Sequence, residues 1–167
     1  MHKEHVYIGL GSNQGDSEEV LSQAMADIDV LENSRLLARS SLYVSSPMGP
    51  QDQPNFVNAV CLAETSLPPA ELLCALQDIE QAHGRVRKAD RWGPRTLDLD
   101  ILLYGNQHID TPDLTIPHYG MADREFVLVP LFEIAPSMIM PDGKPLALWV
   151  AKCNLDGLKR LPTSNQR

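Results

Sequence analysis

The chain has 167 residues, of which 43% are hydrophobic and 22% charged, and its formal net charge is −8. This length suits one domain with its own hydrophobic core, and the composition excludes collagen, coiled coils and disordered chains. No apolar run is long enough to cross a bilayer, and the opening MHKEHVYIGLG lacks the pattern of a signal peptide. Three widely spaced cysteines predict neither a disulfide framework nor a zinc site. We therefore expect a cytoplasmic protein with reduced thiols.

The first half of the chain alternates between extended and helical patterns. Apolar residues at helical spacing follow a first strand, and a second helix follows two further extended runs. Asp16 and Glu19 predict a capping pair for the first helix, and Ser66 is expected to cap the second. The predicted elements are a strand at 5–11, a helix from 16 to 31, extended antiparallel runs at 35–46 and 56–65, and a helix from 66 that stops at Gly84.

The second half opens with a basic loop and a leucine-rich strand. A hairpin turn at 104–107 should lead to a short strand, and helices are expected at 123–135, bent at Pro130, and at 146–153. The last dozen residues are polar and should be loose. This order predicts an α+β, ferredoxin-like βαββαβ core with a mostly antiparallel sheet and extra C-terminal strands and helices. Residues 1–167 should form a single domain, with a compact core at about 5–153 and a flexible tail.

Two aspartates interrupt the apolar strand TLDLDILLYG. Aspartate is depleted from strands, and residues two apart share one face, about 6.6 Å from each other at the backbone. Asp98 and Asp100 can therefore converge on Mg²⁺, which prefers oxygen ligands and often binds one or two carboxylates plus substrate phosphates. The alternative is that the two aspartates only form the solvent-exposed face of an amphipathic strand. Adjacent like charges repel unless a cation neutralises them, which favours the metal.

The segment GRVRKADRWGPR, residues 84–95, concentrates positive charge. Residues 85–95 carry a net charge of +4, and the rest of the chain carries −12. Arginine binds phosphate oxygens in bidentate fashion, and Gly84, Gly93 and Pro94 bracket a loop that can close over a ligand. Alternatives are a solvated loop or a nucleic-acid platform with Trp92 as a stacking residue. The acidic remainder favours one compact polyanion over nucleic acid.

Other motifs in the sequence give weaker indications of function. The glycines of GLGSNQGD fit neither a Walker A loop nor G-x-G-x-x-G, and tight packing at a strand end explains them better. No serine lies in a G-x-S-x-G elbow. His118, in IPHYG, either hydrogen-bonds a phosphate or has a structural role, and His83 is expected at a helix C-terminus.

Three longer segments closely resemble one family. They are GPQDQPNFVNAV (49–60), GRVRKADRWGPRTLDLDILLYG (84–105) and TIPHYGMADREFVLVPLFEIAP (115–136). Together they resemble the hydroxymethyl-dihydropterin pyrophosphokinases of folate biosynthesis, and the similarity runs from Gly11 to about Pro141. The resemblance implies that ATP's terminal pyrophosphoryl unit moves to the pterin hydroxymethyl group and leaves AMP. It also implies two magnesium ions between the aspartates and the triphosphate, and three flexible loops that close over the substrates.

The resemblance also implies roles for individual residues. Asp98 and Asp100 match the metal ligands, with Asp100 also expected to orient the attacking hydroxyl, and Arg85 and Arg95 match loop arginines that engage phosphates during transfer. The pterin side corresponds to Ser45, Pro47, Met48, Phe56, Asn58, Trp92, Arg95 and Phe126, with the two phenylalanines sandwiching the ring. The nucleotide side corresponds to Gln77, Glu80, Arg87, Lys88, Ile101, Thr115, His118, Tyr119 and Arg124.

Two positions depart from the family pattern. Asp113 stands where some members have an arginine, which removes a phosphate contact or shifts it to Arg124. Phe56 replaces the tyrosine of some relatives, which preserves stacking and loses a hydroxyl. These departures bear on single ATP contacts and on affinity.

Two other function classes stay open on the sequence. A ferredoxin-like RNA-binding module would show a steep salt dependence and no need for magnesium. Another Asp-x-Asp metal transferase, such as a sugar-nucleotide enzyme, would use a different acceptor. The pyrophosphokinase interpretation predicts a magnesium-dependent monomer whose partners are the small molecules ATP and hydroxymethyl-dihydropterin, with no nucleic acid and no membrane.

Overall fold

The computed structural model describes residues 3–13, 17–45, 56–83, 97–118, 124–140, 142–153 and 158–161. The main sheet is antiparallel throughout. Its strands are β1 (Glu4–Ser12), β2 (Ser34–Arg39), β3 (Tyr43–Ser45), β4 (Phe56–Thr65), β5 (Asp98–Tyr104) and β8 (Leu158–Arg160). They lie in the order β5-β1-β4-β3-β8, and β2 also pairs with β4. A separate two-stranded sheet contains β6 (Ile109–Asp110) and β7 (Thr115–Ile116).

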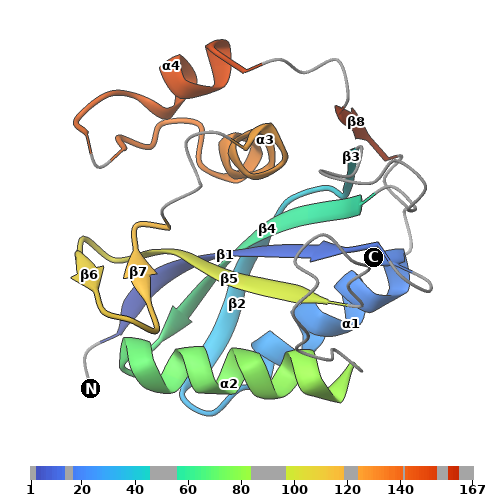
Figure 1. Ribbon diagram of the computed structural model, residues 1–167, viewed down its shortest axis with the longest axis vertical. Coiled ribbons are helices and arrows are strands. Elements are labelled where there is room, and N and C mark those ends of the chain that lie inside the picture. The colour runs from blue at the N-terminus through green and yellow to red at the C-terminus, as the bar shows by residue number, and fades with distance from the viewer. Residues whose placement is uncertain are drawn as a thin grey trace.

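Helices cover both faces of the main sheet (Figure 1). Helices α1 (Ser17–Asp29) and α2 (Pro69–Ala82) pack on one face, and α3 (Glu125–Ile134) and α4 (Leu146–Ala151) lie over the other. Because strand side chains alternate between faces, the sheet supplies two separate cores. One core packs Ile8, Leu10 and their neighbours against α1 and α2, and the second joins Val60 and Leu102 to α3 and α4.

The β1–β5 pair contains one register shift. Tyr7 pairs with Leu103 and Ile8 with Ile101, so Leu102 has no partner on β1. Such a bulge lets two successive side chains point to the same side, and Leu102 and Leu103 both belong to the core under α3. The predicted ferredoxin-like α+β core with a mostly antiparallel sheet is confirmed.

Several predicted elements have different ends. The extended run at 35–46 divides into β2 and β3, and between them the Ser40 N–H donates to the Val60 carbonyl (2.8 Å) while its hydroxyl accepts the Val60 N–H (3.0 Å). Helix α2 begins at Pro69 after an N-cap at Pro68, so the predicted cap at Ser66 was wrong. The neighbouring Thr65 hydroxyl instead accepts the Leu67 N–H at 3.0 Å. Asp16 and Gly84 lie outside the described residues.

The C-terminal half also differs in detail. The turn at 104–107 is confirmed, with Gly105 at φ 52° and Gln107 N–H bonded to the Tyr104 carbonyl, but the following β6 pairs with β7 rather than β5. Helix α3 contains Pro130 as expected, and α4 ends at Ala151. The prediction of a loose tail was wrong for residues 158–160, because β8 pairs with β3. This pairing covers an edge of β3 that would otherwise be open.

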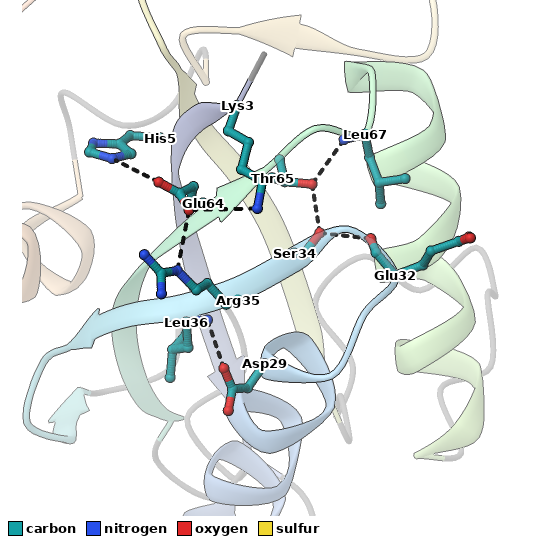
Figure 2. Close-up of polar contacts among 10 residues, drawn as sticks. All are labelled: Lys3, His5, Asp29, Glu32, Ser34, Arg35, Leu36, Glu64, Thr65 and Leu67. Carbon is teal, nitrogen blue, oxygen red and sulfur yellow. Dashed lines mark hydrogen bonds and ion pairs between the residues drawn. The ribbon is translucent and has the colours of Figure 1, made fainter. Parts of the chain in front are cut away.

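A polar cluster holds the end of the sheet near Glu4 (Figure 2). The Glu64 carboxylate lies within 4.0 Å of Lys3, 3.9 Å of His5 and 3.2 Å of Arg35. Ser34 and Thr65 share a 2.6 Å hydroxyl contact across the β2–β4 pair, and the Asp29 carboxylate accepts the Leu36 N–H at 2.8 Å. These contacts tie β2 to both α1 and β4.

Two expectations from composition can be compared with the structure. Cys61, Cys74 and Cys153 are free thiols. Within the described ranges, every helix is too short or too polar to cross a bilayer.

Candidate active site

The two aspartates of β5 lie on one face of the sheet, as predicted. The strand alternates between half-buried Asp98 and Asp100 and fully buried Leu99 and Ile101. The Asp100 side chain is 47% exposed, so it can reach a ligand in solvent. The leucines on the opposite face are in the core over α1 and α2, and this packing fixes the direction in which the carboxylates point.

Glycines stand directly beside both aspartates on the next strand. Gly11 pairs with Asp98, and Gly9 pairs with Asp100. On the other side of β1, Gly11 pairs with Asn58 of β4. Directly paired residues share a face, so Asp98, Gly11 and Asn58 form one row across three strands. Two strand spacings separate the carboxylate from the amide, about 10 Å at the backbone, and Gly11 places no side chain between them.

These glycines do more than pack a strand end. A methyl group on Gly11 would lie 3.1 Å from Asn58 Oδ1, whereas one on Gly9 would meet Leu102 at 3.4 Å. A side chain at either position would also project onto the face that carries the aspartates. The interpretation of tight packing therefore holds for Gly11, whereas Gly9 has room for a methyl group.

The polar end of the row is built by β3 and β4. Asn58 and Ser45 are each 4% exposed, and Asn58 Nδ2 donates to Ser45 Oγ at 2.8 Å. Phe56, half-buried, pairs with Ser45 in the register of the two strands. The structure thus brings together three of the residues predicted for the pterin side. An amide beside an aromatic ring suits a flat heterocycle with both donors and acceptors.

His118 approaches the aspartates from the segment after β7. Its N–H donates to the Leu102 carbonyl at 3.0 Å, so the bulge in β5 places it, and its Nε2 lies 3.8 Å from Asp100 Oδ1. Burial lowers the pKa of His118, the negative charge of Asp100 raises it, Arg124 lowers it, and the net direction is down. The ring is therefore mainly neutral at neutral pH and can hydrogen-bond as donor or acceptor.

Arg124 and Phe126 stand together at the start of α3. The Arg124 guanidinium carbon lies 5.9 Å from the centre of the Phe126 ring, within the range of a cation–π contact. Arg124 is the N-cap residue of the helix. A guanidinium held by an aromatic face keeps donors free for phosphate oxygens.

Further residues predicted for the nucleotide side lie on α2, β5 and β7. Glu80 of α2 is 4% exposed and accepts the Leu99 N–H at 2.7 Å, beneath the strand that carries the aspartates. Ile101 is 3% exposed and its side chain belongs to the core on the helix face. Gln77 is half-buried on α2, and Thr115 is half-buried on β7. Asp113 is exposed just before β7.

Several predicted site residues lie outside the described ranges. They are Pro47, Met48, Arg85, Arg87, Lys88, Trp92, Arg95 and Tyr119. The roles given to them by resemblance stay predictions. Sequence reasoning missed two features of the site: the glycines paired with the aspartates and the bulge at Leu102, whose carbonyl accepts the His118 N–H. Both depend on the pairing of β1 with β5, which the sequence does not show.

The donor set at β5 fits magnesium better than a transition metal. In the ranges that the structure describes, no three His, Cys, Asp or Glu side chains gather as a metal cage. Two carboxylates on an accessible face leave room for waters and phosphate oxygens, which is how Mg²⁺ is commonly bound. Thiol and multiple imidazole ligands, which favour zinc, do not accompany these carboxylates in the described part of the chain.

Comparison with known proteins gives a consistent result. A family model described as 7,8-dihydro-6-hydroxymethylpterin-pyrophosphokinase matches residues 7–136. A 2-amino-4-hydroxy-6-hydroxymethyldihydropteridine pyrophosphokinase of Pseudomonas aeruginosa is 50% identical over 159 residues, covering 95% of this chain and 98% of that relative. The protein of the same description from Haemophilus influenzae is 56% identical over 138 residues, covering 83% and 86%.

A solved structure shares the fold. The crystal structure of Plasmodium falciparum HPPK-DHPS with pteroate superposes with a TM-score of 0.72 at 13% identity. The match covers 90% of this chain and 42% of that one, so this chain spans less than half of the solved protein. At this identity the likeness concerns the fold alone.

Proposed function

Because the chain belongs to the 7,8-dihydro-6-hydroxymethylpterin-pyrophosphokinase family, we propose that Asp98 and Asp100 hold magnesium for its reaction. The enzyme is a diphosphotransferase of folate biosynthesis that uses ATP as co-substrate. It transfers pyrophosphate to the hydroxymethyl group of 6-hydroxymethyl-7,8-dihydropterin. The hydroxyl oxygen bonds to the β-phosphorus of ATP, the bond from that phosphorus to the α-phosphate oxygen breaks, and AMP leaves.

One observation carries the assignment of the site. The row of Asp98, Gly11 and Asn58 places a carboxylate and a buried amide on one face of the sheet, at the two ends of three paired residues. This arrangement suits one substrate with its phosphates at β5 and the other beside Asn58 at β4. Transfer of a phosphoryl-type group depends mainly on such positioning together with charge stabilisation.

The carboxylates of β5 suit two magnesium ions shared with the triphosphate. Bound there, magnesium would neutralise charge on the transferred group. Asp100 has the exposure needed to orient the attacking hydroxyl as well. The rigidity of β5, whose other face is in the core, supports this function because small displacements of reacting groups cost rate.

On the pterin side, Asn58 both donates to and accepts from the ring, and Phe56 and Phe126 stack on its faces. Ser45 fixes the Asn58 amide through their 2.8 Å bond. We assign Pro47, Met48, Trp92 and Arg95 to this side on resemblance alone.

On the nucleotide side, His118 and Arg124 face the phosphates next to Asp100. Their placement by the β5 bulge and the start of α3 supports these roles. Gln77, Arg87, Lys88, Thr115 and Tyr119 belong to this side by resemblance, and Ile101 can contribute only through its backbone because its side chain is in the core. Arg85 and Arg95 are assigned to phosphate contacts during transfer.

The proposal includes a cytoplasmic monomer with a single domain over residues 1–167. Size-exclusion chromatography with light scattering gives the oligomeric state directly, and a mass near the 18.5 kDa of one chain is expected.

The activity is tested by AMP release from ATP and magnesium with and without 6-hydroxymethyl-7,8-dihydropterin. We expect AMP to form only with the pterin and in equal amount to the pterin diphosphate. Release of AMP without an acceptor, or transfer to a sugar in place of the pterin, would contradict the proposal. Omitting magnesium should abolish product formation.

A further inference from the structure

The carboxylate of Glu133, on α3, contacts three residues from two other parts of the chain. It accepts hydrogen bonds from the Ser41 N–H at 2.9 Å, the Ser41 hydroxyl at 2.8 Å and the Tyr43 hydroxyl at 2.7 Å. Nη2 of Arg160, on β8, lies 3.4 Å from the oxygen that the Ser41 hydroxyl contacts. Helix α3, the start of β3 and the edge strand β8 therefore meet at one side chain.

The protonation states at this junction suit its hydrogen bonds. Burial raises the pKa of Glu133, but the hydrogen bonds from Ser41 and Tyr43 and the charge of Arg160 outweigh burial, and the net pKa is lowered. The pKa of the Tyr43 phenol is raised, first by burial and then by its bond to Glu133. At neutral pH an ionised carboxylate thus accepts from a protonated phenol, which is a stronger bond than one between neutral groups.

The strand held by Glu133 ends at the pterin side of the site. Strand β3 has only three residues, with Tyr43 at its start and Ser45 at its end. Tyr43 pairs with Asn58 and Ser45 with Phe56 in the register of β4, and Asn58 donates across to Ser45. A shift of β3 relative to β4 would therefore move the groups that are proposed to contact the pterin.

We propose that Glu133 is a positioning residue for the pterin: by fixing β3 against α3, it sets the place of Ser45 and, through it, the Asn58 amide. This inference rests on the proposed pterin site. Glu133 itself has no contact with the reacting groups, and its partners are Ser41, Tyr43 and Arg160. Its loss should weaken binding of the pterin and leave ATP binding near β5 unchanged, because the aspartates lie on β5, two strands away from β4.

Strand β4, which carries Asn58 near one end, offers a matched control near its other end. Glu64 of β4 also gathers three neighbours, Lys3, His5 and Arg35 (Figure 2). Its side chain is 21% exposed, against 24% for Glu133. Glu64 pairs with His5 at the far end of β1, whereas Asn58 pairs with Gly11. Glu64→Gln therefore removes a comparable charge from the sheet away from the site.

The test compares Glu133→Gln, Tyr43→Phe and Glu64→Gln in steady-state kinetics, with KM measured separately for the pterin and for ATP. In Glu133→Gln the amide carbonyl can still accept from the Ser41 N–H and the Tyr43 hydroxyl, but the NH2 group replaces the oxygen that faces the Ser41 hydroxyl and Arg160, and the charge is lost. We expect a pterin KM raised about tenfold and an ATP KM within about twofold of the parent protein, since loss of hydrogen bonds to a charged group has this scale. Tyr43→Phe should raise the pterin KM about threefold, and Glu64→Gln should change neither constant.

Each result decides between positioning and general support of the fold. Equal rises in both KM values, an unchanged pterin KM in Glu133→Gln, or the same pterin effect in Glu64→Gln would overturn the inference. If Glu133→Gln does not fold by circular dichroism, Tyr43→Phe decides, because it removes one donor and keeps the ring. A parent protein that releases no AMP with the pterin contradicts the proposed function instead, so the two failures are distinguishable.

Discussion

The backbone N–H of Leu99, the residue between Asp98 and Asp100, donates to the carboxylate of Glu80 at 2.7 Å. Glu80 comes from α2, beneath the sheet, and is 4% exposed. Helix α2 is therefore hydrogen-bonded to β5 from the side opposite the aspartates. This bond gives Glu80 a role in supporting the site, and the nucleotide contact implied by the resemblance stays a prediction.

Glu80→Ala should destabilise the protein and Glu80→Gln should do so much less. Alanine leaves the buried Leu99 N–H unsatisfied, at a cost of about 1–3 kcal/mol, whereas the glutamine carbonyl can still accept this bond. Urea unfolding of the parent and both variants gives the comparison. Equal losses in the two variants would show that the charge of Glu80 matters more than its bond to the strand.

Gly11→Ala should impair pterin binding, and Gly9→Ala should be tolerated. The new methyl at position 11 would press on Asn58 Oδ1 at 3.1 Å, but the one at position 9 would make an ordinary contact with Leu102. Overpacking of this kind costs about 1–3 kcal/mol, so we expect the pterin KM to rise about tenfold in Gly11→Ala at unchanged ATP KM. Similar kinetics for the two variants would mean that the place of the Asn58 amide against Gly11 does not determine pterin binding.

The stabilising effect of Glu133 should disappear in acid. Its pKa in the folded protein lies below the ordinary 4.5, so its contribution is complete above about pH 4.5 and is lost as the pH falls through the lowered pKa. At pH 7 we expect Glu133→Gln to be less stable than the parent by about 2 kcal/mol, the scale of hydrogen bonds to a charged group. Denaturant unfolding at several pH values measures this difference. A gap between the two proteins that stays constant below pH 4.5 would contradict the linkage.

Much of the fold followed from local patterns. The alternation of aspartates and leucines in β5 predicted which face carries the carboxylates, and the apolar spacing at 20–31 predicted α1. These features depend on near neighbours in the chain, where the periods of strand and helix are directly visible. The order of elements then indicated the ferredoxin-like core.

Features that depend on pairing between distant segments were not predictable. The sequence does not show that Leu102 is the extra residue of a bulge, that Gly11 stands between Asp98 and Asn58, or that β8 pairs with β3. Nothing in the sequence around Glu80 or Glu133 indicates a bond to Leu99 or Tyr43, and only the tertiary structure brings their carboxylates to these partners. Their roles depend on how distant segments pack together, and the periodicity of the sequence reports only on local structure.

The most direct test of the account is AMP formation by Asp98→Ala and Asp100→Ala, each shown to be folded by circular dichroism. With ATP, magnesium and 6-hydroxymethyl-7,8-dihydropterin, we expect turnover to fall by about three orders of magnitude or more in each variant, since interactions with the transferred group are lost. Near-normal AMP formation by either folded variant would contradict the assignment of Asp98 and Asp100 as the metal-binding pair.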